Sequence, residues 1–442
     1  MGKSNIEKFD ILYMLLHKYV DFWHNNIYYR KVIVFGKDNI DFSAANIFAP
    51  NHQNALMDAM AVLCTIKGQP IFLARADIFK KKFISKILYF LKILPVFRIR
   101  DGFENLKLND DTFRDTFRVM EHKNGLVILP EGNHAGFRKL RQLKKGICRI
   151  AFQAEEESDY KLNVKLVPVG IEFSHYWMFR QVLTVVYGHP IAVSDYIDVY
   201  KENPQKALNE LRDKLSFEMK KLMVHIENEE DYDAINELRS IVNDKYSDSI
   251  KYPKLFRDNR LISKLNDLNV TNYEEYRNIC EESLTVKDLS DKLKLTYRLL
   301  SKKKHPFGWL ALSVLFLLVT SPVFLVGALL NIILFEVPNI QALKLKDKQF
   351  ISSIRYGLTL GISFILMPLY LVLALVFIKP WWLALFAFLA IPLSGILAWN
   401  WLLLMRRTIG GFRIRHMNHR KDSDYQRLRK AYDNLMARIA KL

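Results

Sequence analysis

The stretch NIFAPNHQNALMD, residues 46–58, decides how the first half of this 442-residue chain is expected to fold. Its first five residues form a short, mostly apolar run that ends at Pro50, as a buried strand does. Residues 55–66 then have the spacing of a helix. Because a strand that passes through a short loop into a helix is the repeating unit of α/β proteins, this stretch predicts an α/β domain.

The same alternation continues on both sides of this stretch. Residues 31–36, 71–74, 125–129 and 164–169 read as further strands, and the charged stretches between them have helical spacing. We therefore expect the α/β domain to cover residues 31–225.

The segments that flank the domain have different compositions. Residues 1–30 contain an amphipathic stretch, from about 6 to 27, whose Tyr13 and Trp23 suit a membrane–water interface. That helix either lies on a membrane or packs on its own domain, and both readings stay open. Residues 226–305 are polar and helix-forming, and we expect a connector without chemistry of its own.

Residues 306–405 are predicted to be a membrane region, in three apolar blocks. The block 307–335 would be about 43 Å long as a helix at about 1.5 Å per residue. One crossing needs about 30 Å, so the block is too long for one upright span and too short for two. With Pro322 near its middle, we expect a re-entrant hairpin. Residues 356–378 and 381–405 each fit one transmembrane helix.

Basic residues next to the apolar blocks indicate the orientation. Lysines lie at 302–304 and at 344, 346 and 348, and Arg406 and Arg407 open a basic tail that runs over residues 406–442. If all these flanks are cytoplasmic, as the positive-inside rule favours, the first block enters and leaves on one side and the last two form a hairpin. The alternative of three plain spans would place the tail outside.

Charge and cysteine content narrow the partners and the compartment. The formal net charge of +19 suits an anionic membrane surface, and no motif for DNA or RNA is present, so a nucleic-acid partner rests on charge alone. Cys64, Cys148 and Cys280 are far apart, and we expect free thiols in a reducing compartment. No secretory signal is evident, so we expect an integral membrane protein whose N-terminal half lies on the cytoplasmic face.

His52 and Asp58 are the candidate catalytic pair. An imidazole titrates near neutral pH and can remove the proton from a hydroxyl, and a carboxylate on its other nitrogen fixes the tautomer and stabilises the imidazolium. A separation of six residues across a strand–loop–helix junction can bring the two together. Taken alone, a structural histidine at the start of a helix would be the commoner explanation.

From Tyr29 to about Phe173 the sequence resembles the glycerolipid acyltransferase family, which includes glycerol-3-phosphate and 1-acylglycerol-3-phosphate acyltransferases. Four blocks match in the family's order: VIVFGKDN (32–39) with Asn51-His52, ILPVFRIR (93–100), LPEGN (129–133) with LKKG (143–146), and VPV (167–169). The resemblance implies a mixed β-sheet flanked by helices, and it says nothing about residues 195–442.

The resemblance also assigns roles. His52 would be the general base and Asp58 its orienting partner. Arg100 would hold the acceptor's phosphate, because a guanidinium offers permanently charged, bidentate donors, and Pro168 would lie near the acyl donor. The implied substrate-binding set is Arg75, Arg98, Arg100, Glu131, Gly132, Asn133 and Pro168. The donor would be a thioester of coenzyme A or of acyl carrier protein, and neither a cofactor nor a metal is implied.

Three features depart from the usual family pattern. Five residues, rather than four, separate His52 from Asp58, a spacing that resembles fungal-type glycerol-3-phosphate acyltransferases. The third block reads Asn133-His134-Ala135 where Thr-Arg-Ser is common, so an arginine is lost. Arg98 replaces an apolar residue. The spacing favours glycerol 3-phosphate as the acceptor.

The expected function is transfer of a fatty acyl group from a thioester to a glycerol-phosphate acceptor, in phospholipid biosynthesis. Two alternatives remain open. One is an acyltransferase for lysophosphatidate or another lyso-lipid, and the other is a non-catalytic lipid-binding membrane protein with the same fold.

Overall fold

A computed structural model describes residues 6–97, 109–245, 254–302 and 304–442. The chain divides into two compact units. Unit 1 comprises Met1–His225 together with Lys344–Tyr356, and unit 2 comprises Ile226–Leu343 with Gly357–Leu442. The sequence assigned residues 344–356 to the membrane region, whereas the structure makes them part of the α/β unit.

Unit 1 is built on one mixed sheet, which confirms the predicted fold class. Its strands run in the order β1-β7-β6-β2-β5-β3-β4, and β8 pairs with β6. Strands β2 to β6 are parallel to one another, whereas β7 and β8 are antiparallel to β6. Strand β1 pairs with β7 in parallel. The bounds are β1 Lys31–Phe35, β2 Asn46–Pro50, β3 Ile71–Arg75, β4 Ile93–Val96, β5 Leu126–Val127, β6 Lys165–Phe173, β7 Val182–Tyr187 and β8 Ile191–Ala192.

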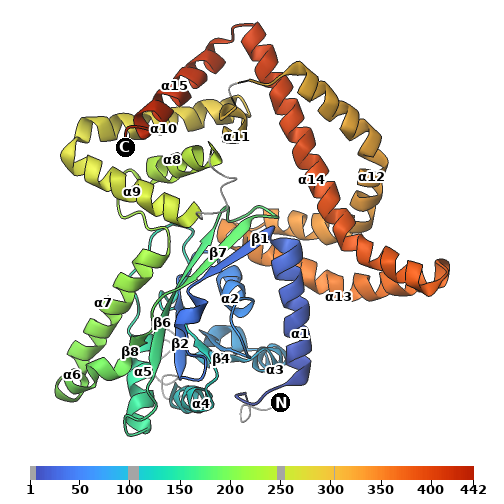
Figure 1. Cartoon of the computed structure of the whole chain (residues 1–442). Coiled ribbons are helices and arrows are strands. Elements are labelled where there is room, and N and C mark those ends of the chain that lie inside the picture. Colours follow the sequence, from blue (N-terminus) through green and yellow to red (C-terminus); the bar gives the residue numbers. More distant parts are fainter. Residues whose placement is uncertain (1–5, 98–108, 246–253, 303) are drawn as a thin grey trace. The chain divides into compact units, whose positions relative to one another are not determined.

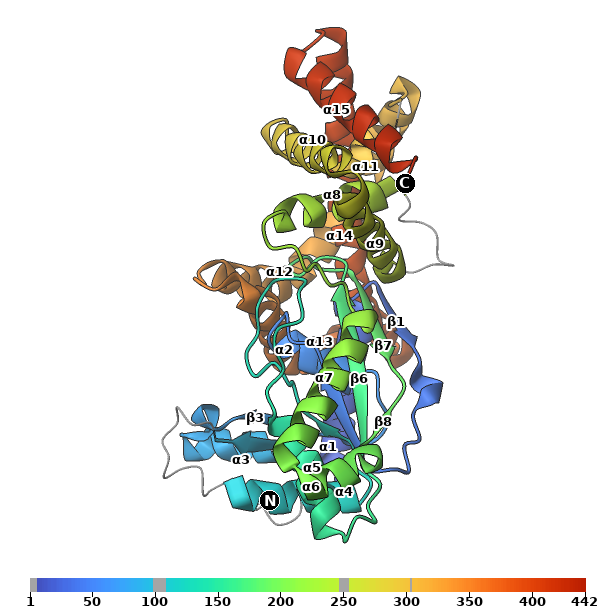
Figure 2. The ribbon, with the colours of Figure 1, turned by 90° about the vertical axis from the view of Figure 1, so that its left-hand side faces the viewer.

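Helices cover both faces of this sheet (Figures 1 and 2). Ile47 and Ala49 of β2 are fully buried in the cluster that α5 and α7 complete. Phe48 points to the other face, where its ring meets Tyr187. The helices of unit 1 are α1 Ile11–Phe22, α2 Leu56–Leu63, α3 Lys82–Phe90, α4 Asn109–Glu121, α5 Gly146–Glu157, α6 Ile197–Glu202 and α7 Pro204–Leu222, and a π-helix, Trp23–Tyr28, extends α1.

Helix α1 packs on unit 1 with one face and stays apolar on the other. Tyr13, Val20 and Trp23 are buried, whereas Leu12 and Leu15 are more than half exposed. Asp10 caps the helix by accepting a hydrogen bond from the backbone N–H of Tyr13. The packing on the helix's own domain is thus observed, and contact of its outer face with a membrane stays a prediction.

The described part of unit 2 is helical. Buried charges join its connector helices, as where Arg239 binds Asp258 at 2.7 Å, and α15 packs along α10 (Figure 1). The basic tail is therefore mostly ordered helix rather than a loose extension. The helices are α8 Tyr232–Lys245, α9 Lys254–Thr271, α10 Tyr273–Lys292, α11 Tyr297–Leu300, α12 Phe307–Leu343, α13 Ile351–Phe377 (of which Ile351–Tyr356 lies in unit 1), α14 Trp381–His419 and α15 Ser423–Ile439.

The expected re-entrant hairpin at 307–335 is wrong, because these residues belong to the continuous helix α12. Pro322 cannot donate a hydrogen bond to the carbonyl of Leu318, four residues earlier. The hydroxyl of Ser321 donates to that carbonyl instead, at 2.8 Å, so the helix continues without an unpaired group.

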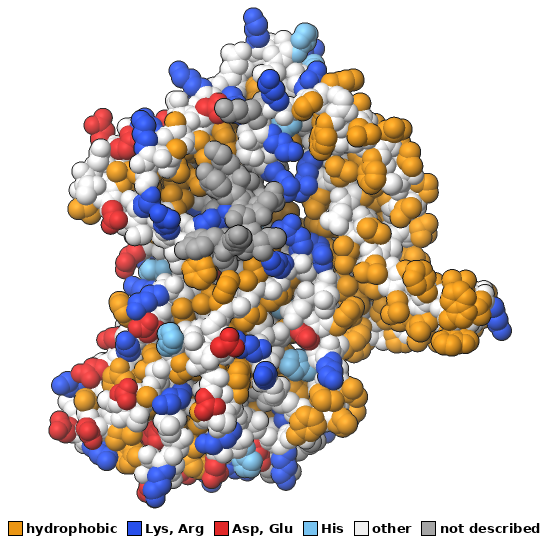
Figure 3. All heavy atoms as spheres, viewed as in Figure 1, with side chains coloured by type: hydrophobic (Ala, Val, Ile, Leu, Met, Phe, Trp, Pro, Cys, Tyr) orange, Lys and Arg blue, Asp and Glu red, His pale blue; other side chains and the backbone are white. Residues whose placement is uncertain are grey.

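Three helical segments of the described chain are long and apolar enough to cross a membrane: Phe307–Leu343, Lys348–Phe377 and Trp381–His419. Hydrophobic side chains cover much of their exposed surface (Figure 3).

Helices α12 and α14 pack antiparallel. Leu310 lies against Gly411, and the side-chain amide of Asn331 donates to the carbonyl of Ile391 at 3.0 Å. The start of α12 and the end of α14 therefore lie at the same end of this helix pair.

Candidate active site

The end of strand β2 positions His52. The side chain of Asn51 bonds both backbone groups of Ile171 on β6, accepting from its N–H at 2.6 Å and donating to its carbonyl at 3.1 Å. His52 follows directly, and its Nδ1 lies 2.9 Å from Oδ2 of Asp58. The two bonds between Asn51 and Ile171 thus fix the point at which the chain leaves the sheet, directly before His52.

Asp58 is fully buried and strongly hydrogen-bonded. Besides His52 Nδ1, its Oδ2 accepts from the backbone N–H groups of Gln53, at 2.8 Å, and Asn54, at 2.7 Å. A carboxylate held by two fixed donors stays in place as a partner for the imidazole. The structure therefore brings the predicted pair together.

The loop, and not the helix, absorbs the additional residue between His52 and Asp58. Ala55 has φ 48° and ψ −124°, an unusual backbone conformation for a residue with a side chain, and α2 begins at the next residue. Asp58 consequently lies in the first turn of α2, facing back toward His52. An insertion inside the helix would have rotated it away by about 100°.

Glu131 holds the backbone of His52. Its Oε1 accepts from the N–H of His52 at 2.7 Å, and its Oε2 accepts from the N–H and Nε of Arg141 at 3.2 and 3.1 Å. Burial raises the pKa of Glu131, and these donors offset part of the rise. Gly132 follows with φ +70°, a conformation that favours glycine. The structure thus places Glu131 against the loop that carries His52.

A second imidazole lies next to His52. The rings of His52 and His134 are 5.5 Å apart and meet edge to face. Burial lowers the pKa of His134, and the neighbouring His52 lowers it further, so His134 favours the neutral form beside His52. Within the described part of the chain, Nε2 of His52 has no hydrogen-bond partner.

The remaining predicted residues lie in different surroundings. Arg75, at the end of β3, binds Asp77 through Nε at 3.1 Å and is therefore already paired. Pro168 is buried inside β6 opposite Ala49. Asn133 is exposed. Arg98 and Arg100 lie outside the described residues, just after β4, which ends in register with Arg75.

The sequence analysis did not identify several residues around the loop between β2 and α2, which carries His52. The hydroxyl of Tyr176 donates to Gln53 at 2.6 Å, and the guanidinium of Arg138 lies over the Tyr176 ring while pairing with buried Glu172. Asp347, from the second stretch of unit 1, lies 3.6 Å from His134. Only His134 had a signal in the sequence, as part of the altered third block.

Comparisons with known proteins agree on one family. Residues 31–172 match the family model named Acyltransferase. Over 169 residues the chain is 27% identical to glycerol-3-phosphate O-acyltransferase 1 of Saccharomyces cerevisiae, covering 38% of this chain and 21% of that protein. Over 128 residues it is 30% identical to glycerol-3-phosphate O-acyltransferase 2 of the same organism, covering 29% and 17%. The matches thus span only about a fifth of the length of these relatives.

One solved structure shows a weaker likeness. The 1-acyl-sn-glycerophosphate acyltransferase of Thermotoga maritima aligns with a TM-score of 0.34 and 19% identity, covering 47% of this chain and 80% of that one.

Proposed function

We propose that the chain transfers a fatty acyl group from a thioester to a hydroxyl of glycerol 3-phosphate, because residues 31–172 match the family model named Acyltransferase and are similar to two glycerol-3-phosphate O-acyltransferases. The observation that carries this proposal is the contact between His52 and buried Asp58. Glu131 and strand β6 hold the start of the loop that carries His52. The two relatives named for glycerol 3-phosphate and the spacing of five residues support that acceptor over a lyso-lipid.

In the proposed mechanism His52 is the general base. Asp58 engages Nδ1, so Nε2 is left to take the proton from the acceptor hydroxyl as its oxygen attacks the thioester carbonyl. The tetrahedral intermediate collapses by breaking the carbon–sulfur bond, and the imidazolium returns the proton to the departing thiolate. Asp58 stabilises the imidazolium in between. No covalent acyl-enzyme is needed, and the donor is a thioester of coenzyme A or of acyl carrier protein.

Binding of the acceptor's phosphate is assigned to three arginines that end or follow neighbouring strands in the sequence. Arg98 and Arg100 follow β4 and lie outside the described residues, and Arg75 ends β3, which pairs in parallel with β4. A phosphate can take over donors from Arg75, because its carboxylate partner Asp77 lies at the surface, where an ion pair is worth about 0–1 kcal/mol.

We place the catalytic domain on the cytoplasmic face of a membrane. Lys344, Lys346 and Lys348 lie between the apolar stretches of α12 and α13, in the segment Lys344–Tyr356 that belongs to unit 1. Basic residues next to membrane-spanning helices favour the cytoplasm, so this flank supports the cytoplasmic placement of unit 1.

The test is a matrix of acceptors and donors on the full-length chain in phospholipid vesicles. Glycerol 3-phosphate and lysophosphatidate are each offered with acyl-CoA and with acyl carrier protein thioesters, and His52→Ala is compared with His122→Ala, an exposed histidine just after α4. We expect fastest transfer to glycerol 3-phosphate, a loss of about 10³-fold or more in His52→Ala, and none in His122→Ala.

Other outcomes would overturn parts of the proposal. Faster transfer to lysophosphatidate would show that this lyso-lipid, and not glycerol 3-phosphate, is the preferred acceptor. Near-normal turnover by His52→Ala would exclude His52 as the general base. Absence of transfer to every acceptor would favour a non-catalytic lipid-binding protein.

A further inference from the structure

The segment Lys344–Tyr356, between the apolar stretches of α12 and α13, is packed into unit 1 rather than merely joined to it. Ile351, Ser352, Ser353 and Tyr356 are each less than a tenth exposed. The hydroxyl of Tyr356 donates to the carbonyl of Val20 at 3.0 Å. A simple tether would need neither buried serines nor specific hydrogen bonds.

The first contact with the catalytic loop is made by Ser353. Its Oγ accepts a hydrogen bond from the backbone N–H of Leu56, at 3.1 Å. Leu56 is the first residue of α2, the helix that carries Asp58, and the methyl side chain of Ala55 at the N-cap cannot accept this bond. Ser353 thus supplies from 297 residues away a cap that helices usually obtain from their own N-cap residue.

The second contact reaches His52 through His134. The ring of Phe350 lies 4.6 Å from that of His134, edge to face, and Asp347 Oδ2 lies 3.6 Å from His134 Nε2. His134 in turn meets the ring of His52. One side chain therefore separates this segment from the proposed general base.

A third contact passes through Tyr176. The hydroxyl of Ser352 donates to the backbone carbonyl of Tyr176, whose own hydroxyl donates to Gln53 in the catalytic loop. Three separate contacts thus connect residues 347–353 with the loop and helix that hold His52 and Asp58.

We propose that Lys344–Tyr356 forms part of the acyl-transfer site by positioning the residues around His52. Ser353 positions α2 and its Asp58, and Phe350 with Asp347 positions His134 against His52. All are positioning residues that act through other side chains, and the inference rests on the proposed function for its kinetic readout. Because the segment is continuous with two apolar helices, the geometry of the base depends on the chain's membrane anchor.

The test uses four substitutions in the full-length chain: Ser353→Ala, Asp347→Asn, Phe350→Leu and Phe350→Tyr. Lys346→Ala is the matched control, because Lys346 is an exposed residue of the same segment. Loss of a helix cap costs about fivefold in an equilibrium constant, so we expect kcat to fall about fivefold in Ser353→Ala, with KM for both substrates changed less than about twofold. Phe350→Leu should lower kcat similarly, and Phe350→Tyr, which keeps the ring, should restore it.

Hydrogen exchange gives a second readout that does not need enzymatic activity. In Ser353→Ala the amides of residues 54–58 should exchange about fivefold faster, whereas those of strand β6 should not change, and Lys346→Ala should alter neither. If the wild-type chain transfers no acyl group at all, the proposed function fails, and the exchange experiment still decides whether the segment holds the loop. Unchanged kcat in the active enzyme, or unchanged exchange in residues 54–58, would overturn the inference.

Discussion

Replacing Asp58 by asparagine tests the charge of the proposed catalytic pair with little change in shape. His52 and the two backbone donors all bind the same oxygen, Oδ2, and Oδ1 is buried with no partner among the residues that the structure describes. An asparagine can therefore keep all three hydrogen bonds through its carbonyl oxygen. The substitution removes the negative charge and leaves an amide NH₂ in place of Oδ1.

The expected loss follows from electrostatics. Opposite charges about 4 Å apart interact by about 4 kcal/mol at an effective dielectric constant of about 20. The imidazolium that forms during transfer would lose that stabilisation, which corresponds to about 10³-fold in kcat. The buried NH₂ without an acceptor should also lower the free energy of unfolding by about 1–3 kcal/mol.

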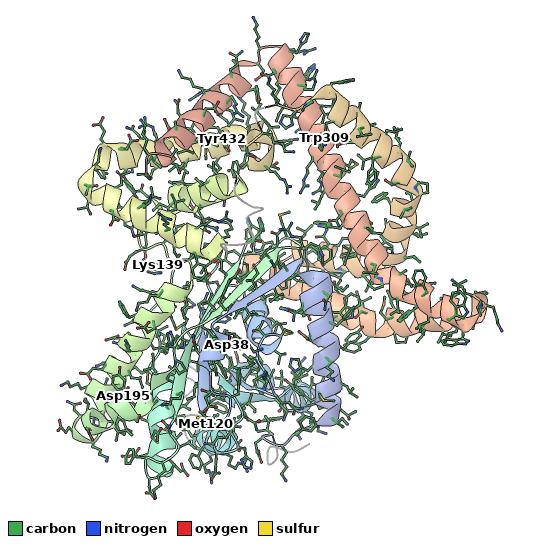
Figure 4. All side chains as sticks on the ribbon, in the orientation of Figure 1. Asp38, Met120, Lys139, Asp195, Trp309 and Tyr432 are labelled. Carbon is green, nitrogen blue, oxygen red and sulfur yellow. The ribbon has the colours of Figure 1, made fainter. Side chains whose placement is uncertain are left out.

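The assay is steady-state transfer to glycerol 3-phosphate, together with thermal unfolding of the same preparations. Asp38→Asn, an exposed carboxylate labelled in Figure 4, is the control and should match the wild type in both. KM values should change by less than about threefold, because neither carboxyl oxygen is offered to a substrate. A kcat within threefold of wild type in Asp58→Asn would refute the role of the charge.

Three further predictions concern stability. Burial lowers the pKa of His24 to about 4, so the folded protein should lose up to about 3 kcal/mol as pH falls from about 6.5 to 4, and His24→Phe should flatten that dependence in denaturation curves. Glu131→Gln should lower both kcat and the unfolding temperature, because an amide cannot accept at both positions, and an unchanged enzyme would contradict its hold on His52. Gly327→Ala should destabilise the α12–α14 pair, since a Cβ there would lie 2.5 Å from a backbone oxygen of α14, whereas Gly308→Ala, which meets nothing within 4 Å, should not.

Local patterns predicted the part of the site that is local in sequence. The strand, loop and helix of residues 46–58 have strong signals of their own, and six residues are too few for His52 and Asp58 to end far apart. The backbone angle of Ala55, which makes the contact possible, had no signal, because alanine is common in many conformations.

Pairing between side chains explains where the sequence reading went wrong. Arg75 reads as a free cation, although Asp77, two residues further on, neutralises it. Pro322 predicts a break in the helix, but the hydroxyl of the preceding Ser321 donates to the carbonyl that the proline leaves without its usual donor. Residues 344–356 show no periodicity or motif, and their place in unit 1 depends on contacts with residues about 300 positions earlier, which no local pattern encodes.

The division of unit 1 into two stretches has a consequence for biosynthesis. A ribosome that has reached residue 300 has made every strand of the sheet, but neither the cap of α2 nor the ring that supports His134. Those groups are translated only after α12, the first of the three apolar helices. On the proposed function, a nascent chain would complete its acyl-transfer site only after α12 has been translated, which would couple the onset of catalysis to the synthesis of its first apolar helix.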